Sequence, residues 1–228
     1  MPVYDKSMFT WGSEIEIGDV PKSFYIPKGM GSWEYSETDI LNLLPPFAGV
    51  AADPKGIDPP MGGEVNLRPS KSWEDHVGKI GELLDLFREA GHTPTTSFVS
   101  HTHVHVHIPG LRDDMEGLRK VVGYVQRNQE DIVRYVHAYQ DLPEIKEGKK
   151  AKTYLKLDGG RLIPDWLCEN LKQATSFTDF IRLYCCGKDG KTRGRPIRYA
   201  INLYCLKHTQ TIEMRLFRAS LDPQMLSD

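Results

Sequence analysis

The sequence predicts an α+β protein, because segments with the periodicity of strands and segments with the periodicity of helices both occur along it. With 228 residues, of which 39% are hydrophobic, the chain is long enough to bury a full core, and we expect one domain over residues 1–228. Strand alternation occurs at residues 9–17, 62–70, 96–108, 197–204 and 211–218. Helical spacing of apolar residues occurs at residues 72–90, 113–139, 165–174 and 176–184.

Four of the chain's eight histidines lie in one predicted strand, and we call them the histidine row: His101, His103, His105 and His107. Side chains alternate between the two faces of a strand, so these four would share one face. The residues between them, such as Val104 and Val106, would point into the core. A strand face of four imidazoles is typical of a binding site.

Carboxylates repeat the same two-residue step on three other predicted strands. Glu14 and Glu16 share a face of the first, Glu64 shares one with Asn66 and Arg68, and Glu213 shares one with Arg215. Each pattern also fits a solvated strand face, and Glu213 and Arg215 could simply pair with each other. If these strands are adjacent in one sheet, the carboxylates would repel one another unless a polycation or two divalent metals neutralised them. A metal site of that charge suits phosphate chemistry.

Local signals also define the helix ends and two long connections. Ser72 with Asp75, and Ser176 with Asp179, have the spacing of helix N-terminal caps. Gly91 has the position of a C-terminal cap. Residues 18–62 predict a long connection, with a short strand at Trp33–Tyr35. Residues 141–160 are rich in lysine, which suits either a lid over phosphates or a solvated tether.

Composition excludes several classes of function. The net charge of −2, from 29 basic and 31 acidic residues, gives no argument for a nucleic-acid-binding surface. The longest apolar runs are too short for a membrane span, and the N-terminus has no signal-peptide pattern. The four cysteines form neither a CxxC pair nor a disulfide framework. We therefore expect reduced cysteines and a cytoplasmic protein.

Five motifs in order resemble those of the amidoligase family, the carboxylate–amine ligases related to glutamine synthetase and glutamate–cysteine ligase. The resemblance covers roughly residues 9–222 and is specific because of the order of the motifs. The motifs are Gly12-Ser13-Glu14-Ile15-Glu16, Gly63-Glu64-Val65, the His-Val-His within 103–107, Arg198-Tyr199-x-x-Asn202-Leu203, and Thr211-Ile212-Glu213-Met214-Arg215-Leu216-Phe217.

The resemblance implies a fold and a reaction. The fold is a curved, mainly antiparallel sheet with helices packed on one face, like the catalytic domain of glutamine synthetase. In the reaction, ATP phosphorylates a substrate carboxylate, and an amine displaces phosphate from the acyl-phosphate to form an amide. The expected partners are therefore ATP, two or more Mg²⁺ ions (with Mn²⁺ as an alternative), a small-molecule or peptide carboxylate, and an amine.

Site residues follow from the same resemblance. The metal ligands would be Glu14, Glu16, Glu64 and Glu213 with a histidine among His103, His105 and His107. Arg215, Glu64 and Arg198 would act in catalysis. Cofactor binding would involve Arg215, Arg198, Asn202 and His103, and Arg68 is added on strand-face geometry alone.

Two features depart from the family pattern. The family usually has one His-x-His, whereas four histidines alternate here. The preceding residues favour His103 and His105 as the match, but the distance to the following helix favours His105 and His107. The chain also ends at Asp228, soon after the Glu-x-Arg strand, where members of the family commonly continue, so we expect a short or C-terminally truncated member.

Two alternatives of other classes stay open. A zinc or iron hydrolase or oxygenase could use the histidine row, since imidazole favours transition metals. Against it, histidines at i, i+2 and i+4 of one strand spread over about 13 Å, at about 3.3 Å per residue, which is too far for all of them to reach one ion. A catalytically inactive nucleotide-binding module would keep the same polar strand faces. The substrates and the oligomeric state do not follow from the sequence.

Overall fold

The computed structural model describes residues 4–18, 48–52, 62–89, 91, 101–138, 162–191 and 199–218. The chain divides into two compact units. The first unit comprises Met1–Met8 and Val106–Leu216, and the second comprises Phe9–His105 and Phe217–Asp228. Two strands pass through the boundary, β4 (His101–His107) and β6 (Thr211–Arg218). The expectation of a single domain stays a prediction.

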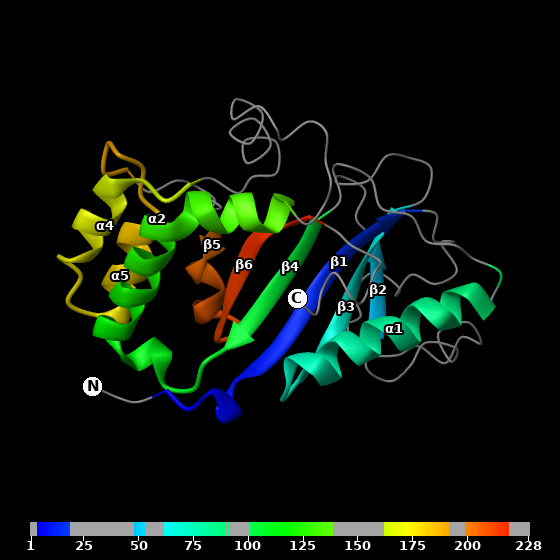
Figure 1. Ribbon diagram of the computed structural model, residues 1–228. Helices are drawn as coiled ribbons and strands as arrows, with labels where there is room; N and C mark the ends of the chain where they lie inside the picture. The colour runs from blue at the N-terminus through cyan, green and yellow to red at the C-terminus, as the bar shows by residue number, and fades with distance from the viewer. Residues whose placement is uncertain are drawn as a thin grey trace. The chain divides into compact units, whose positions relative to one another are not determined.

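In the second unit, the strand order is β2-β3-β1-β4 (Figure 1). The strands β1 (Thr10–Gly18) and β3 (Gly62–Ser70) pair antiparallel, as do β3 and β2 (Ala48–Ala52). The predicted strands at 9–17 and 62–70 are therefore confirmed. Strand β2 was not predicted, because its Ala-Gly-Val-Ala-Ala sequence has no alternation of polar and apolar residues. It is recognised as a strand only by its pairing with β3.

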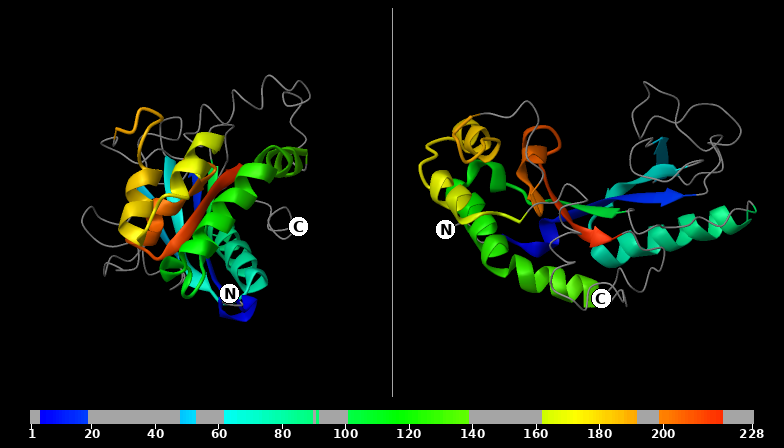
Figure 2. Two further views of the ribbon diagram at one scale, coloured as in Figure 1. Left: turned by 90° about the vertical axis from the view of Figure 1, so that its left-hand side faces the viewer. Right: turned by 90° about the horizontal axis from the view of Figure 1, so that it is seen from above.

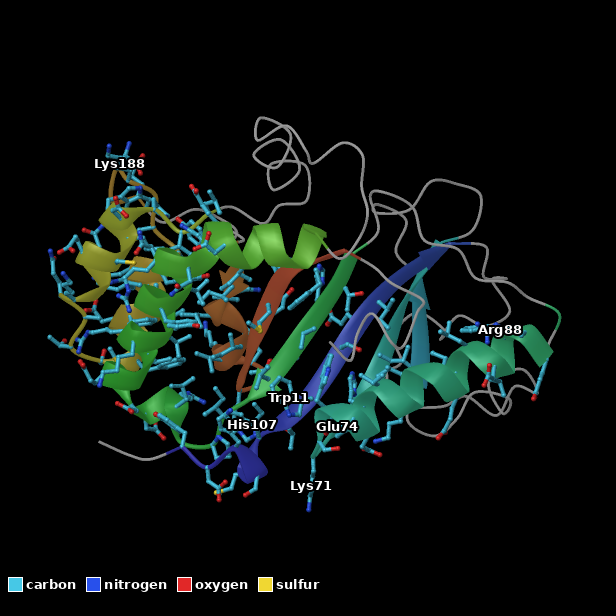
Figure 3. The ribbon with its side chains drawn as sticks, viewed as in Figure 1. Trp11, Lys71, Glu74, Arg88, His107 and Lys188 are labelled. Carbon is cyan, nitrogen blue, oxygen red and sulfur yellow. The ribbon has the colours of Figure 1, made fainter. Side chains whose placement is uncertain are left out.

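Helix α1 (Trp73–Glu89) covers β1 and β3 in the second unit, and Figure 2 shows it beside these strands. The Ser72 hydroxyl accepts the Asp75 N–H at 3.0 Å, and Gly91 has a positive φ of 78°, so both predicted caps are confirmed. Glu74 lies near the start of the helix and Arg88 near its end (Figure 3), which suits the helix dipole. The predicted apolar stripe is buried: Val77, Ile80, Leu84 and Phe87.

Among the described residues of the first unit, three helices pack around its core: α2 (Met115–Ala138), α4 (Asp165–Leu171) and α5 (Phe177–Tyr184). Asp114 begins α2 by accepting the Gly117 N–H at 2.9 Å, and the Tyr4 hydroxyl donates to the same carboxylate at 2.6 Å. Short 3₁₀ turns occur at Lys6–Met8 (η1) and Leu111–Asp113 (η4). The most deeply buried core residues include Leu118, Leu167, Phe180, Tyr184 and Ile201.

Replacing Ser176 with alanine should destabilise the chain by about 1 kcal/mol, because an N-cap hydroxyl is lost. Ser176 accepts the Asp179 N–H at 3.1 Å, as the spacing of the two residues predicts. We expect the midpoint of thermal unfolding to fall by about 2–4 °C. Ser176→Asp should stay close to the original, since aspartate also caps; equal losses in both variants would exclude capping as the cause.

The predicted strand at 197–204 is wrong in its second half. The structure has a two-residue strand, β5 (Ile201–Asn202), which pairs antiparallel with β6, and then a 3₁₀ helix, η5 (Leu203–Lys207). The Asn202 side chain accepts the Tyr204 N–H at 3.1 Å and so begins the helical turn. This local bond competes with a continued strand ladder, which strand alternation does not detect. Residues 192–198 lie outside the described residues.

The α+β class is confirmed, and the three strand pairs with a described register are antiparallel. The glutamine synthetase-like fold stays a prediction. Predictions for Trp33–Tyr35, residues 96–100 and residues 141–160 lie outside the described residues. In the described part of the chain, no helix combines the length and apolar character needed to cross a membrane. None of the four cysteines, all of which are described, forms a disulfide bond.

Candidate functional site

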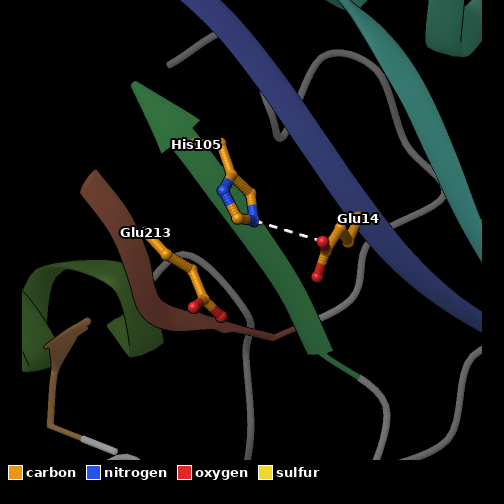
Figure 4. A group of neighbouring side chains, drawn as sticks. All are labelled: Glu14, His105 and Glu213. Atoms are coloured by element: carbon orange, nitrogen blue, oxygen red, sulfur yellow. Dashed lines mark ion pairs between the residues drawn. The ribbon is translucent and has the colours of Figure 1, made fainter. Parts of the chain in front are cut away.

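Glu14 on β1 contacts two members of the histidine row on β4. Its Oε2 atom lies 3.3 Å from His103 Nδ1, and its Oε1 atom lies 3.3 Å from His105 Nε2. Figure 4 shows the contact with His105. The His103 side chain is 7% exposed and that of Glu14 is 31% exposed, so the contacts are well sheltered from water. Alternation along β4 therefore places two imidazoles against one carboxylate.

The environment keeps Glu14 ionised. Burial opposes the charged form and would raise its pKa. The hydrogen bonds and charges of His103 and His105 outweigh burial, so the pKa of Glu14 lies well below its usual range. At neutral pH the residue is a carboxylate between two imidazoles, and these three groups are all of metal-ligand type.

The ladder between β1 and β3 places the other predicted carboxylates. Glu16 and Glu64 are direct partners across the two strands, and Glu14 is the partner of Asn66. The register therefore sets Glu14 and Glu16 opposite Asn66 and Glu64, with the same two-residue step on both strands. The side chains of Glu16, Glu64 and Arg68 lie outside the described residues, as does that of His101. The backbone register alone thus puts two glutamates in partner positions beside Glu14.

A buried pair behind β1 was missed by sequence reasoning. Ser13 precedes Glu14 and so belongs to the opposite face of the strand, where its hydroxyl lies 2.8 Å from His76 Nε2 on α1. His76 is fully buried, stacks on Trp73 with ring centroids 5.6 Å apart, and is kept neutral because burial lowers its pKa to about 4. A histidine within the apolar stripe of a predicted helix was the available signal. The pair anchors β1 to α1 next to Glu14.

Protonation of His76 should destabilise the chain in mildly acidic solution. The pKa of His76 is 6.5 in the unfolded chain and about 4 in the folded chain. Between pH 6.5 and pH 4 the unfolded chain therefore binds more protons than the folded chain, and the free energy of unfolding falls as the pH falls. The shift corresponds to at most about 3 kcal/mol, lost between pH 6.5 and pH 4. Denaturant titrations from pH 7.5 to 4 would measure it. His76→Gln should reduce the pH dependence; an unchanged pH dependence in that variant would exclude His76 as its source.

Glu213 on β6 lies in the first unit and is nearly inaccessible, with 3% exposure. Its Oε1 atom pairs with Arg215 Nη1, and the two side chains are 5% and 8% exposed. Its Oε2 atom accepts from Asn202 Nδ2 at 2.5 Å and from Cys205 Sγ at 3.2 Å. The sequence allowed Glu213 and Arg215 either to pair with each other or to bind a metal and a phosphate. The structure shows that the two side chains pair. Figure 4 shows the side chain of Glu213 pointing away from its strand.

Asn202 and Cys205 therefore hold Glu213. Asn202 was predicted to bind cofactor. In the structure its side-chain Nδ2 donates to Glu213, and its side-chain Oδ1 accepts the Tyr204 N–H. Cys205 was not predicted as a site residue. The 3₁₀ turn of η5 brings its sulfur to 3.3 Å from Asn202 Nδ2. The sequence places Cys205 three positions after Asn202, and this spacing brings the two side chains together only because the backbone forms a 3₁₀ turn here.

The remaining predicted residues are placed separately. His107, at the end of β4, has no described contact with Glu14; it lines a cavity of about 300 Å³ in the first unit with Arg112 and Gln210. Arg198 lies outside the described residues. Among the residues that the structure describes, the two sets of contacts around predicted site residues are Glu14 with His103 and His105, and Glu213 with Arg215, Asn202 and Cys205.

The groups in the Glu14 set are of types that bind divalent cations in proteins. Carboxylate oxygen suits Mg²⁺, and imidazole nitrogen extends the choice to Mn²⁺ and Zn²⁺. The Glu213 set places a carboxylate and a guanidinium side by side, a combination suited to a metal and to an anion respectively. Comparison of the chain with protein-family models gives no match, and comparison with curated proteins gives none either.

Proposed function

We propose that this chain is an ATP- and Mg²⁺-dependent carboxylate–amine ligase with a fold like that of the glutamine synthetase catalytic domain. A carboxylate oxygen of the substrate attacks the γ-phosphorus of ATP, and ADP leaves. The nitrogen of an amine then attacks the acyl carbon, phosphate leaves, and the amine gives up a proton as the amide forms. The ordered motifs support this proposal, and so does the arrangement of carboxylates.

One observation carries the proposal: Glu16 and Glu64 are ladder partners beside Glu14, whose carboxylate is kept ionised. Like charges directly opposite each other destabilise a sheet unless a cation compensates them. Three glutamates on adjacent strands suit hard divalent cations of the kind that accompany ATP.

Roles for the residues follow from the resemblance and from chemistry. We assign metal binding to Glu14, Glu16, Glu64 and Glu213 with a histidine of the row. The contacts of Glu14 favour His103 or His105 over His107 for that histidine. Arg215 and Arg198 would neutralise charge on the transferred phosphoryl group, with Arg68 as a further anion-binding side chain.

The test is phosphate release. The chain is incubated with ATP, Mg²⁺ and a pool of amino acids and polyamines, and inorganic phosphate and amide products are followed. We expect phosphate release that needs both Mg²⁺ and the pool, stops with EDTA, and gives one amide per phosphate. ATP binding without turnover under any of these mixtures would instead indicate an inactive nucleotide-binding module.

A transition-metal hydrolase is the second candidate, and one observation favours it. His103 and His105 each lie 3.3 Å from an oxygen of the Glu14 carboxylate, so imidazole and carboxylate, the ligand types of Zn²⁺ sites, are in contact on these strands. Hydrolysis of ester or amide substrates with Zn²⁺ and no ATP would favour this candidate. The same assay with Mg²⁺ in place of Zn²⁺ distinguishes the hydrolase from the ligase, because Mg²⁺ binds weakly to imidazole ligands and would not support the hydrolase.

A further inference from the structure

We propose that a cavity in the first unit binds a free α-amino acid, with Arg112 pairing with its carboxylate and Asp113 pairing with its ammonium group. The cavity has a volume of about 300 Å³, and the polar side chains that line it are those of His107, Arg112, Asp113 and Gln210. All four residues belong to the first unit. The inference goes beyond the proposed function and does not rest on it.

The polar groups around this cavity are available to a ligand. Among the residues that the structure describes, these four side chains make no hydrogen bond and no ion pair, although Arg112 and Asp113 carry opposite charges. The guanidinium carbon of Arg112 lies over the ring of Phe177, 4.8 Å from the ring centroid. A guanidinium held by its face keeps its N–H edge available for a carboxylate. The cavity therefore offers a cation and an anion that are not paired with each other.

Arg112 and Asp113 stand on a hydrogen-bonded turn. The backbone N–H groups of Leu111, Asp113 and Asp114 each donate to the carbonyl oxygen three residues earlier, at 3.1 Å. Gly110, which also lines the cavity, begins the turn with a φ of 80°. The positions of the two charged residues are thus set by the backbone before any ligand binds, which lowers the cost of ordering them on binding.

Gln210 has an unusual backbone conformation. Its φ is 59°, and it is the only residue other than glycine with a positive φ in the part of the chain that the structure describes. Glycine adopts this left-handed conformation freely, whereas a residue with a Cβ is strained in it, and strain of this kind clusters at binding sites. Glutamine at this position indicates that its amide group, which can donate and accept hydrogen bonds, serves the cavity.

The class of ligand follows from size and charge. A volume of about 300 Å³ lies at the lower end of the about 300–1,000 Å³ typical of ligand pockets, so the cavity suits a small molecule. A ligand with a carboxylate alone would leave Asp113 without a partner, and a simple amine would leave Arg112 without one. A free amino acid carries both charges on one carbon, and its carboxylate can accept two hydrogen bonds from one guanidinium. His107 and Gln210 then remain for its side chain.

The experiment is a calorimetric titration of the full chain with each standard L-amino acid in turn, without ATP and without added metal. We expect at least one of them to bind saturably with a dissociation constant of about 1 mM or lower. Two analogues of that amino acid are then titrated, the amine without its carboxylate and the acid without its amino group. Each should bind at least about tenfold more weakly, because one charged hydrogen-bonded pair is lost.

Variants locate the binding site. Arg112→Gln and Asp113→Asn each remove one charge and should weaken binding at least about tenfold. Matched controls are Arg127→Gln and Asp189→Asn, which change exposed residues outside this cavity and should stay within about twofold of the original chain. Gln210→Gly should weaken binding about threefold or more through loss of the amide. Its midpoint of thermal unfolding should not fall, because glycine relieves the left-handed strain.

The inference would be overturned if no amino acid bound saturably, or if either analogue bound as tightly as the amino acid. Equal affinity in Arg112→Gln, Asp113→Asn and the two controls would place the bound amino acid elsewhere and would overturn it as well. Circular dichroism checks that each variant is folded. Phosphate release from Mg²⁺-ATP is measured separately, and its absence would count against the ligase while leaving the titration to decide the role of the cavity.

Discussion

Replacing Glu14 with glutamine should abolish most ATP-dependent phosphate release, with a loss on the order of a hundredfold or more if Glu14 is a metal ligand. The amide has nearly the same shape as the carboxylate but no charge, so it binds Mg²⁺ far more weakly. It also leaves the sheltered imidazoles of His103 and His105 without their anionic partner. The measurement is steady-state phosphate release over a range of Mg²⁺ concentrations.

Glu169→Gln is the matched control for this variant. Glu169 is an exposed glutamate in α4 that pairs only with Lys172 among the described contacts, at 2.7 Å. Its replacement should change stability and turnover little, because exposed ion pairs contribute at most about 1 kcal/mol. If Glu14→Gln retained the turnover of this control at every Mg²⁺ concentration, Glu14 would not be a metal ligand and the proposed site would be wrong.

Replacing Arg215 with methionine should remove turnover and also destabilise the fold by about 3–5 kcal/mol, because it leaves the Glu213 carboxylate buried without its cation. The two side chains are only 8% and 5% exposed, so solvent screens the pair little. The burial of the pair therefore adds a loss of stability to the expected loss of turnover. Denaturant unfolding and phosphate release measure the two effects.

The double variant Glu213→Gln, Arg215→Met tests the cause of the destabilisation. Removing both charges should recover much of the stability lost in Arg215→Met, since no uncompensated charge is then buried. Turnover should stay absent, because both proposed functional groups are gone. If the double variant were as unstable as the sum of the two single variants, the ion pair would not be the source of the effect.

Patterns within single segments were sufficient for most of the secondary structure. The caps at Ser72 and Ser176 and the apolar stripe of α1 depend on residues three or four apart, which sequence displays directly. Strand alternation likewise placed Glu14 and Glu16 on one face of β1. The two failures, β2 and the end of the strand at 197–204, are places where a distant strand or a side-chain cap decides the backbone.

The candidate site shows the same division. Residue types and their two-residue steps led us to predict a site that includes Glu14, Glu64, Glu213, Arg215 and the histidine row. Which groups touch was decided by contacts between segments far apart in the sequence. His103 contacts Glu14 across 89 residues of sequence, and His76 contacts Ser13 across 63.

Glu213 shows most clearly the difference between what the sequence predicts and what the fold decides. Its alternation with Arg215 was visible along the strand, yet the same alternation fits a metal ligand, a phosphate-binding pair or an internal ion pair. Only the fold brings Asn202 and Cys205 to its second oxygen and buries the whole group. The periodicity of a sequence shows which side chains lie on the same face of a strand or helix, because this follows from backbone geometry. The partners of a side chain and its burial depend instead on which distant segments pack against it.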